Sequence, residues 1–308
     1  MIRVPELQHK YLATLFSTFL SVLSVVSKRF DVVHIYGVGN SVLIPLLRGA
    51  SQKTIVSVDA LDWKRSKWNR FASWYLRMAE RLAALFANCI VVDNEVVGRY
   101  YWDRFGVHTD YVPYGAEVQR MEKAEAVEKY GLKRDGYLLF VGRLKPEKGV
   151  HRLVEAFDGL ATDKKLAIVG DDSFSRDYIR SLKSTPNTKV KFLGYVYGED
   201  YEQLCSNAYL YVTASEVEGT SPALVAAMGY GNCVVVNSIP ENLETIGDAG
   251  VSFRENDVND LRRCLQELID NPEMVREYRI KAQNRVAQHY NWDAVTDKLE
   301  KLYGSISQ

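Results

Sequence analysis

Residues 140–149, Phe-Val-Gly-Arg-Leu-Lys-Pro-Glu-Lys-Gly, join an apolar run to a glycine turn that carries several cations. This pattern predicts a strand that ends in a Gly-Arg turn, followed by a helix that begins near Gly149. Arg143 and Lys148 flank the turn, and cations beside a strand-to-helix turn suit an anionic ligand such as a diphosphate. A surface β-α turn with solvated charges is the alternative, which the spacing alone leaves open.

A second stretch, residues 210–228, repeats the strand-turn-helix pattern. Residues 210–215 are apolar enough for a buried strand, and Pro222 fits the first turn of the helix that follows. Glu218 therefore falls at the carboxyl end of a strand, beside a helix N-terminus. Open α/β sheets bind their ligands in crevices of this kind. An ordinary acid at a helix start is the alternative interpretation of Glu218.

Strand-like and helical segments alternate along most of the chain, which predicts an α/β protein with parallel sheets. In the first part of the chain we expect strands at residues 31–36, 54–58, 89–92 and 110–113. In the second part we expect strands at residues 137–142, 166–169, 190–193, 209–213, 233–236 and 251–253. Helices are predicted at residues 67–86, 96–105, 257–270 and 272–289, and the polar residues 116–135 are predicted to connect the two parts.

Together the two stretches resemble the family-four retaining glycosyltransferases, which have the two-domain GT-B fold. Residues 142–149 closely match the family's Gly-Arg-Leu-x-Pro-Glu-Lys-Gly pattern, and Glu218-Gly219 begins the family's second motif. Residues 230–236 and 239–242 are most similar to the branch that includes bacterial rhamnosyltransferase-like enzymes. The resemblance extends from about residue 1 to the C-terminus and is strongest in residues 137–250.

The resemblance implies two Rossmann-like domains with parallel sheets. Residues 1–118 would form a partial, acceptor-side N-terminal domain, and residues 119–291 the domain that binds a nucleotide sugar. Residues 292–308 would form a helix that crosses back to the first domain. We expect the first domain to be incomplete, because the family's opening strand and glycine-rich loop find no counterpart after Met1. A fragment, a partner chain that completes the domain and a smaller rebuilt domain are three alternatives.

The resemblance also implies roles for the candidate site residues. Arg143 and Lys148 would hold the departing diphosphate, Glu218 would orient the donor sugar, and these three are the candidate catalytic residues. Fixed cations and helix N-termini would stabilise the leaving charge, so that no metal and no cofactor are expected. The residues predicted to bind the donor are Gly142, Arg143, Lys148, Gly170, Glu218, Gly219, Thr220 and Ser221.

Two positions depart from the family pattern. The family's second glutamate, which usually holds the nucleotide ribose, falls at Ala226, whose methyl group accepts no hydrogen bond. The family's histidine in the first domain falls at Asp59, which places an anion where a neutral donor is usual. His34, at the end of the preceding strand, is either a substitute for that histidine or a residue that packs structurally.

The function implied is a retaining hexosyltransferase of polysaccharide biosynthesis. It would move a sugar from a nucleotide diphosphate sugar to a glycan or a lipid-linked acceptor. The alternative is a degenerate, non-catalytic GT-B protein that serves as a partner subunit or a glycan-binding module. Asp59, Ala226 and the missing opening segment favour this alternative, whereas Arg143, Lys148 and Glu218 favour the enzyme.

Composition agrees with an ordinary globular enzyme, because the 308 residues are 47% hydrophobic and 25% charged. The net charge of zero does not favour nucleic acid as a partner. Residues 1–118, however, hold 14 Lys and Arg against 10 Asp and Glu, which would suit contact with an anionic membrane surface. The four scattered cysteines, which predict small buried side chains in a reducing compartment, are Cys89, Cys205, Cys233 and Cys264.

We therefore expect a cytoplasmic protein, with peripheral contact to the inner face of the membrane as a further prediction. Cations and aromatic residues alternate between Trp63 and Trp74, and such a face suits a bilayer surface. A solvated helix face with its tryptophans in the core is the alternative, which we favour slightly. The apolar segment from Tyr11 to Val26 is short for a membrane span and predicts an amphipathic core helix.

Overall fold

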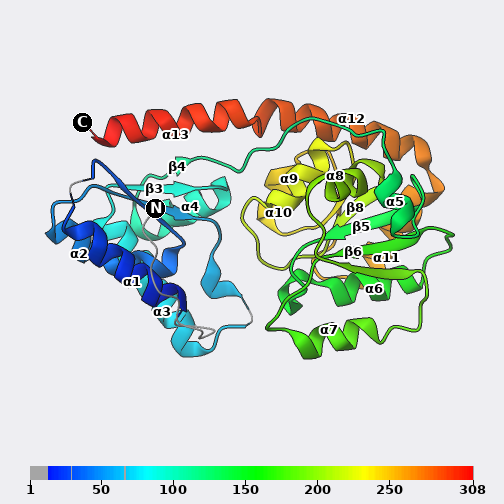
Figure 1. Cartoon of the computed structure of the whole chain (residues 1–308), viewed down its shortest axis with the longest axis horizontal. Helices are drawn as coiled ribbons and strands as arrows, with labels where there is room; N and C mark the ends of the chain where they lie inside the picture. Colours follow the sequence, from blue (N-terminus) through cyan, green and yellow to red (C-terminus); the bar gives the residue numbers. More distant parts are fainter. Residues whose placement is uncertain (1–12, 29, 66, 308) are drawn as a thin grey trace. The chain divides into compact units, whose positions relative to one another are not determined.

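A computed structural model of the protein describes residues 13–28, 30–65 and 67–307 (Figure 1). The chain divides into two compact units. The first unit runs as far as Pro113 and also takes in the chain from Val295 onward, while the second is Tyr114–Ala294. Both units contain a parallel sheet with helices packed on it, so the predicted α/β class is confirmed.

The first unit is built on a sheet whose described strands follow the order β1-β2-β3-β4, all of them parallel. Its strands are β1 (Val33–Tyr36), β2 (Thr54–Val58), β3 (Cys89–Val92) and β4 (Asp110–Tyr111). Its helical segments are α1 (Ala13–Val26), η1 (Val38–Leu43), α2 (Ile44–Gly49), η2 (Asp62–Lys64), α3 (Arg70–Phe86) and α4 (Glu95–Phe105). Tyr11 and Leu12, predicted to open the first helix, lie outside the described residues.

Local chemistry explains where α3 begins. The sequence pattern predicted a helix from residue 67, but the helix begins at Arg70 because Asn69 caps it. The Asn69 side chain accepts a hydrogen bond from the Ala72 backbone N–H at 2.8 Å, which satisfies a donor that the first helical turn leaves open. The buried stripe of α3, including Leu76 and Ala83, then packs on the sheet.

The second unit has the larger sheet, whose strand order is β10-β9-β8-β5-β6-β7, and every pairing described is parallel. The first strand of the unit, β5, therefore lies inside the sheet, and the chain winds outward from it in both directions. This is the doubly wound order, with a topological switch point between β5 and β8. The strands are β5 (Tyr137–Val141), β6 (Lys165–Val169), β7 (Val190–Gly194), β8 (Leu210–Thr213), β9 (Cys233–Asn237) and β10 (Val251–Phe253).

Two apolar cores lie on opposite faces of this sheet, as the alternation of side chains along β5 shows. Leu138 and Phe140 belong to one core, while Tyr137 and Leu139 belong to the other. The helical segments of the unit are α5 (Glu125–Lys129), η3 (Pro146–Lys148), α6 (Val150–Asp158), α7 (Arg176–Lys183), α8 (Gly198–Asn207), α9 (Pro222–Gly229), α10 (Pro240–Ile246), α11 (Val258–Asp270) and α12 (Pro272–His289).

The polar residues 116–135 pack on the second unit along much of their length. The Ala116 backbone N–H donates to the Tyr290 carbonyl at 2.7 Å, and the Met121 N–H donates to the Ser206 hydroxyl at 3.0 Å. Val127, on α5, is fully buried in the core of this unit. The segment predicted as a connection is thus part of the second unit.

The last helix, α13 (Trp292–Ser307), begins in the second unit and continues into the first. Within the first unit, Tyr303 on α13 lies 2.7 Å from Nδ1 of His34, and the Ser57 hydroxyl lies 2.8 Å from Nε2. Desolvation lowers the pKa of His34 to about 4, so its imidazole is neutral near pH 7. These contacts agree with the structural interpretation of His34.

The described helices include none that is long and apolar enough to cross a bilayer. The interpretation of Trp74 as a core residue is wrong, because its side chain is 58% exposed. Trp63 and Trp68, by contrast, are half-buried and pack against the core of the first unit. One face of α3 packs on the sheet and the opposite face is exposed to solvent. Trp74 lies on the exposed face, whereas the sequence analysis had assigned it to the buried one.

Candidate functional site

The candidate site lies at the carboxyl ends of β5 and β8, the two strands that meet at the switch point. After β5 the chain turns at Gly142–Arg143, passes through η3 and enters α6. After β8 it turns through Glu218 and enters α9. The two stretches that the sequence singled out are therefore neighbours across this crevice, as the strand order of a doubly wound sheet requires.

Two glycines let the backbone segments around the crevice approach one another. Gly149 has φ +65°, and a Cβ there would overlap the carbonyl oxygen of Ala214, which follows β8. Gly170 has φ +122°, and a Cβ there would overlap the carbonyl oxygen of Gly142. A side chain would be strained by conformation and excluded by volume at both positions. Gly170, predicted to bind the donor, thus brings the ends of β6 and β5 together.

Lys148 and Glu218 form an ion pair across the crevice, with Nζ donating to Oε1. Their side chains are 16% and 9% exposed, so both charges are largely removed from solvent. Each partner offsets the desolvation cost of the other, because a lone charge in this position would be strongly unfavourable. The sequence predicted both residues as site residues, and the fold brings them together from 70 positions apart.

Two further ion pairs surround this one. Lys145 Nζ lies 3.6 Å from Oδ1 of Asp172, and Arg152 donates to Glu216 at 2.6 Å. Sequence reasoning did not assign any of these four residues a role in binding. Lys145 stood inside the first motif and Asp172 follows Gly170 closely, so their proximity to the motifs was the available signal. Their pairing depends on which strands are neighbours, which spacing does not reveal.

Arg143, unlike Lys148, is exposed and forms no ion pair among the described residues. Its backbone carbonyl accepts a hydrogen bond from the Lys145 N–H at 2.9 Å, which closes the turn tightly. The guanidinium is therefore available to an anion that enters from solvent. Of the two predicted cations, Lys148 is paired within the protein and Arg143 is open to solvent.

The start of α9 supplies the remaining predicted contacts. Gly219, Thr220 and Ser221 are all buried, and the Ser221 carbonyl accepts the Val225 N–H at 3.0 Å as the helix begins. Ala226, one turn further along, is half-buried and packs against the core of the second unit. Its methyl group gives this turn no polar contact to a ligand, as the sequence indicated.

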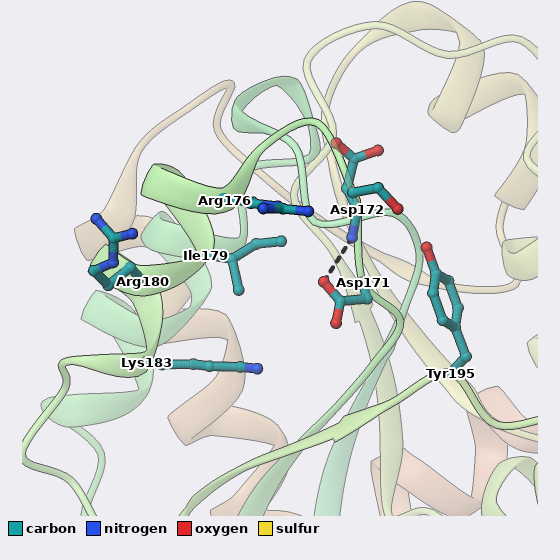
Figure 2. A pocket seen from close by; sticks show the side chains of 8 residues that line it. Asp171, Asp172, Arg176, Ile179, Arg180, Lys183 and Tyr195 are labelled. Atoms are coloured by element: carbon teal, nitrogen blue, oxygen red, sulfur yellow. Dashed lines mark hydrogen bonds between the residues drawn. The ribbon is translucent and has the colours of Figure 1, made fainter. Parts of the chain in front are cut away.

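A shallow hollow of about 480 Å³ lies beside the crevice, bounded by the end of β6, by α7 and by the loop that follows β7 (Figure 2). Asp171 and Asp172 line one side of it, and the Asp171 carboxylate accepts the Asp172 backbone N–H at 2.8 Å. Tyr195 lies next to them, while Arg176 and Lys183 of α7 extend toward them from the other side of the hollow. Arg180 also lines the hollow, but its guanidinium turns away and pairs with Asp177 at 3.0 Å.

Asp59 lies in the first unit, directly after β2. Desolvation raises the pKa of its carboxyl above the usual value, the Asp62 carboxylate raises it further, and Arg65 opposes the shift. Among the described residues, no group of three or more His, Cys, Asp or Glu side chains is arranged to bind a metal ion.

Comparison with known proteins identifies the family. Residues 122–285 match the family model described as glycosyl transferases group 1, and residues 46–117 match a domain of unknown function, DUF1972. The first match spans more than half of the chain. The chain therefore belongs to the group 1 glycosyltransferase family.

Curated relatives are longer than this chain. O-antigen chain mannosyltransferase B of Escherichia coli is 27% identical over 217 residues, which cover 68% of this chain and 55% of the relative. A GDP-mannose-dependent monoacylated alpha-(1-6)-phosphatidylinositol monomannoside mannosyltransferase of Corynebacterium glutamicum is 25% identical over 229 residues, or 67% of this chain and 59% of that protein. The chain thus spans little more than half the length of these relatives.

Solved structures confirm the predicted GT-B fold of two Rossmann-like halves. Sucrose-phosphate synthase from Thermosynechococcus elongatus superposes with a TM-score of 0.84 at 19% identity, covering 99% of this chain and 80% of that one. The Anabaena protein HepE, solved in complex with UDP-glucose, gives a TM-score of 0.82 at 18% identity, covering 94% of this chain and 82% of its own. At these identities the likeness concerns the fold alone.

Proposed function

We propose that this chain transfers a sugar from a nucleotide diphosphate sugar to a glycan or lipid-linked acceptor, with retention of anomeric configuration. Family membership supports the reaction class. Two relatives are named as mannosyltransferases, one of them GDP-mannose-dependent, and a structural neighbour was solved with UDP-glucose. A role in polysaccharide biosynthesis is consistent with the O-antigen enzyme among these relatives.

The observation that carries the proposal is the Lys148–Glu218 ion pair at the β5–β8 switch point. Its charges are held in a desolvated crevice, where an electrostatic interaction is stronger than in water. A diphosphate that reaches Lys148 would replace Glu218 as the partner of the lysine ammonium group. The Glu218 carboxylate would then be free to accept hydrogen bonds from sugar hydroxyls. One pair of side chains thereby prepares the site for both parts of the donor.

In the proposed mechanism, negative charge builds on the diphosphate as the bond to the anomeric carbon breaks. Lys148 and Arg143 stabilise that charge from fixed positions, with no metal required. The backbone N–H groups at the start of α9, near Thr220 and Ser221, add a favourable dipole. The acceptor hydroxyl attacks from the face that the diphosphate leaves, and a phosphate oxygen takes its proton. The new glycosidic bond therefore keeps the donor's configuration.

Sequence similarity supports two finer proposals. Residues 230–236 and 239–242 resemble the rhamnosyltransferase-like branch, which favours a hexose or deoxyhexose as the transferred sugar. We place the activity in the cytoplasm or at the inner face of the membrane, because all four cysteines are free thiols, as is usual in a reducing compartment.

The proposal is tested by thermal shift of the purified chain with UDP, GDP, dTDP and ADP and with their sugars. Ligand at about 100 times its dissociation constant should stabilise the protein by about 2.7 kcal/mol, a rise of several degrees in melting temperature. Lys148→Ala should lose the shift relative to its own ligand-free form, and turnover with the matching sugar should fall by about 100-fold or more. Lys281→Ala, which removes an exposed lysine of α12, is the matched control.

A shift with one nucleotide that Lys148→Ala abolishes and Lys281→Ala retains would establish the donor class. An unchanged turnover rate in Lys148→Ala would remove Lys148 from the mechanism. If no nucleotide or nucleotide sugar shifts the wild type, the proposal fails in favour of a non-catalytic GT-B protein.

A further inference from the structure

The outward face of α3 combines cations with large apolar side chains. Phe71 is 71% exposed, Trp74 is 58% exposed and Leu85 is 65% exposed. Arg70, Trp74, Arg77 and Arg81 follow one another at helical spacings of three or four residues, so they share one face of the helix. Lys64 and Lys67, just before the helix, are also exposed. Exposed aromatic rings at such a density, ringed by arginines, need an explanation.

The charge on this face has one sign. Glu80 is the single acid in the sequence of α3, and it is fully buried, accepting a hydrogen bond from the Tyr100 hydroxyl at 2.9 Å. None of the three arginines of α3 forms an ion pair with a described residue. The surface helix α12 of the second unit shows the ordinary arrangement, since Arg276 pairs with Glu273 and Lys281 with Glu277. The arginines of α3 have no such partners among the described residues, which leaves their exposed guanidinium groups open to an external anion.

A neighbouring helix extends the apolar surface. α1 contains no charged residue, and Phe19 and Leu23, one turn apart, are exposed on it. Both α1 and α3 pack against η1, so the two helices belong to the same region of the first unit (Figure 1). The aromatic rings of Phe71 and Trp74 are themselves in contact, with centroids 5.8 Å apart.

We propose that this face, formed by Phe71, Trp74 and Leu85 with Arg70, Arg77 and Arg81, binds the surface of an anionic lipid bilayer. Tryptophan and phenylalanine rings settle at the boundary between headgroups and acyl chains, where one side is apolar and the other wet. Arginines beside them attract anionic headgroups. A helix that is apolar and basic outside, with its acid turned inward, meets both requirements of such a surface. This inference does not depend on the reaction that the second unit catalyses.

The test is co-sedimentation of the full chain with vesicles of phosphatidylcholine alone, or of phosphatidylcholine mixed with phosphatidylglycerol. At low salt the chain should bind the mixed vesicles and not the neutral ones, and about 1 M salt should release most of it. Arg70→Ser with Arg81→Ser should weaken binding by roughly 25-fold, about fivefold for each cation removed. Phe71→Ser with Trp74→Ser should abolish binding at low salt.

Ile280→Ser is the matched control, because Ile280 is an equally exposed apolar residue on α12, where acids accompany the cations. It should bind vesicles as the wild type does. Each variant should keep the wild-type melting temperature and nucleotide shift, since the substituted side chains are exposed. Absence of binding to the mixed vesicles at low salt would overturn the proposal, and would indicate an acidic protein as the occupant. Equal loss in Ile280→Ser would overturn it too.

Discussion

The two units differ in whether their cations are paired with acidic side chains. In the second unit three cations around the crevice are matched by acids, in the pairs Lys148–Glu218, Lys145–Asp172 and Arg152–Glu216, and Arg143 is left open. On α3 of the first unit, the three arginines form no ion pair with any described residue. Paired and desolvated charges keep a fixed geometry that suits one small anion. Exposed cations of one sign act together on an extended surface. The placement of acids, more than the number of cations, therefore distinguishes the two kinds of site.

The largest effect is expected from Gly170→Ala, which tests the tight backbone on which the paired site depends. The new methyl group would overlap the Gly142 carbonyl oxygen, at a backbone conformation that side chains rarely adopt. We expect a loss of about 4 kcal/mol in the free energy of unfolding, measured by urea titration. Gly194→Ala is the control, because its φ of +69° is also positive but its Cβ would meet open space. It should cost only about 1 kcal/mol, and equal costs would contradict the close-approach argument.

A smaller loss is expected when one charge of the buried pair is removed. Lys148→Ala leaves the Glu218 carboxylate desolvated and alone, which should cost about 3 kcal/mol of unfolding free energy. The double variant Lys148→Met with Glu218→Gln should recover most of that loss, because it leaves no charge unpaired. Urea titrations of both proteins decide the point, and a double variant no more stable than Lys148→Ala would count against the pairing.

Glu80, the buried acid of the first unit, should make the unfolding free energy depend on pH. Burial raises its pKa to about 7, against the opposing hydrogen bond from the Tyr100 hydroxyl. The folded state therefore holds this proton more tightly than the unfolded chain, and stability falls as pH rises from the ordinary carboxyl pKa to about 7. Above that range the loss is complete. Glu80→Gln should raise the unfolding free energy by roughly 2 kcal/mol at about pH 8.

The Glu80→Gln variant should gain nothing at about pH 5, where the wild-type carboxyl is already protonated in the folded state. Urea titrations at both pH values measure the difference. Glu277→Gln, which alters an exposed acid of α12, should show no comparable gain at either pH. A wild type and Glu80→Gln with the same pH dependence would show that Glu80 is not the titrating group.

The smallest effect on stability is expected when an exposed arginine of α3 is removed. Arg81→Ala should change the unfolding free energy by less than about 0.5 kcal/mol, because its guanidinium is exposed and has no acidic partner on α3. Arg276→Ala on α12 should behave alike, since exposed ion pairs contribute little to stability. Thermal unfolding of the two variants would then fail to separate them, whereas vesicle binding should fall only for Arg81→Ala.

Much of the sheet framework could be predicted from sequence. The strands at residues 54–58, 89–92 and 251–253 were predicted with the observed bounds, because short runs with β-branched or aromatic residues between turns leave few alternatives. The helix at 272–289 was predicted equally well, with proline at its start. The short helices α7 and α10 were not predicted, since one or two turns carry too little periodicity to be recognised.

The candidate site was predictable only in part. The motifs contained Lys148 and Glu218, but their contact depends on β8 pairing with β5, a property of the whole sheet. The acidic partners Asp172, which is buried, and Glu216, which is half-buried, have no signal in spacing, because their role comes from close approach at Gly170 and Gly149. Trp74 was assigned to the core because an aromatic residue on a helix usually packs inward. Which face points outward is decided by the other elements of the unit.

The hydrogen bond between His34 and Tyr303 joins residues 269 positions apart in the chain. During synthesis the first unit's sheet emerges early, but its last helix emerges only after the whole second unit. The second unit, Tyr114–Ala294, is by contrast one continuous stretch of the chain. Until α13 has been made, His34 and its strand β1 lack the contact with Tyr303. Completion of the first unit therefore depends on a helix that is made after every strand of the second unit.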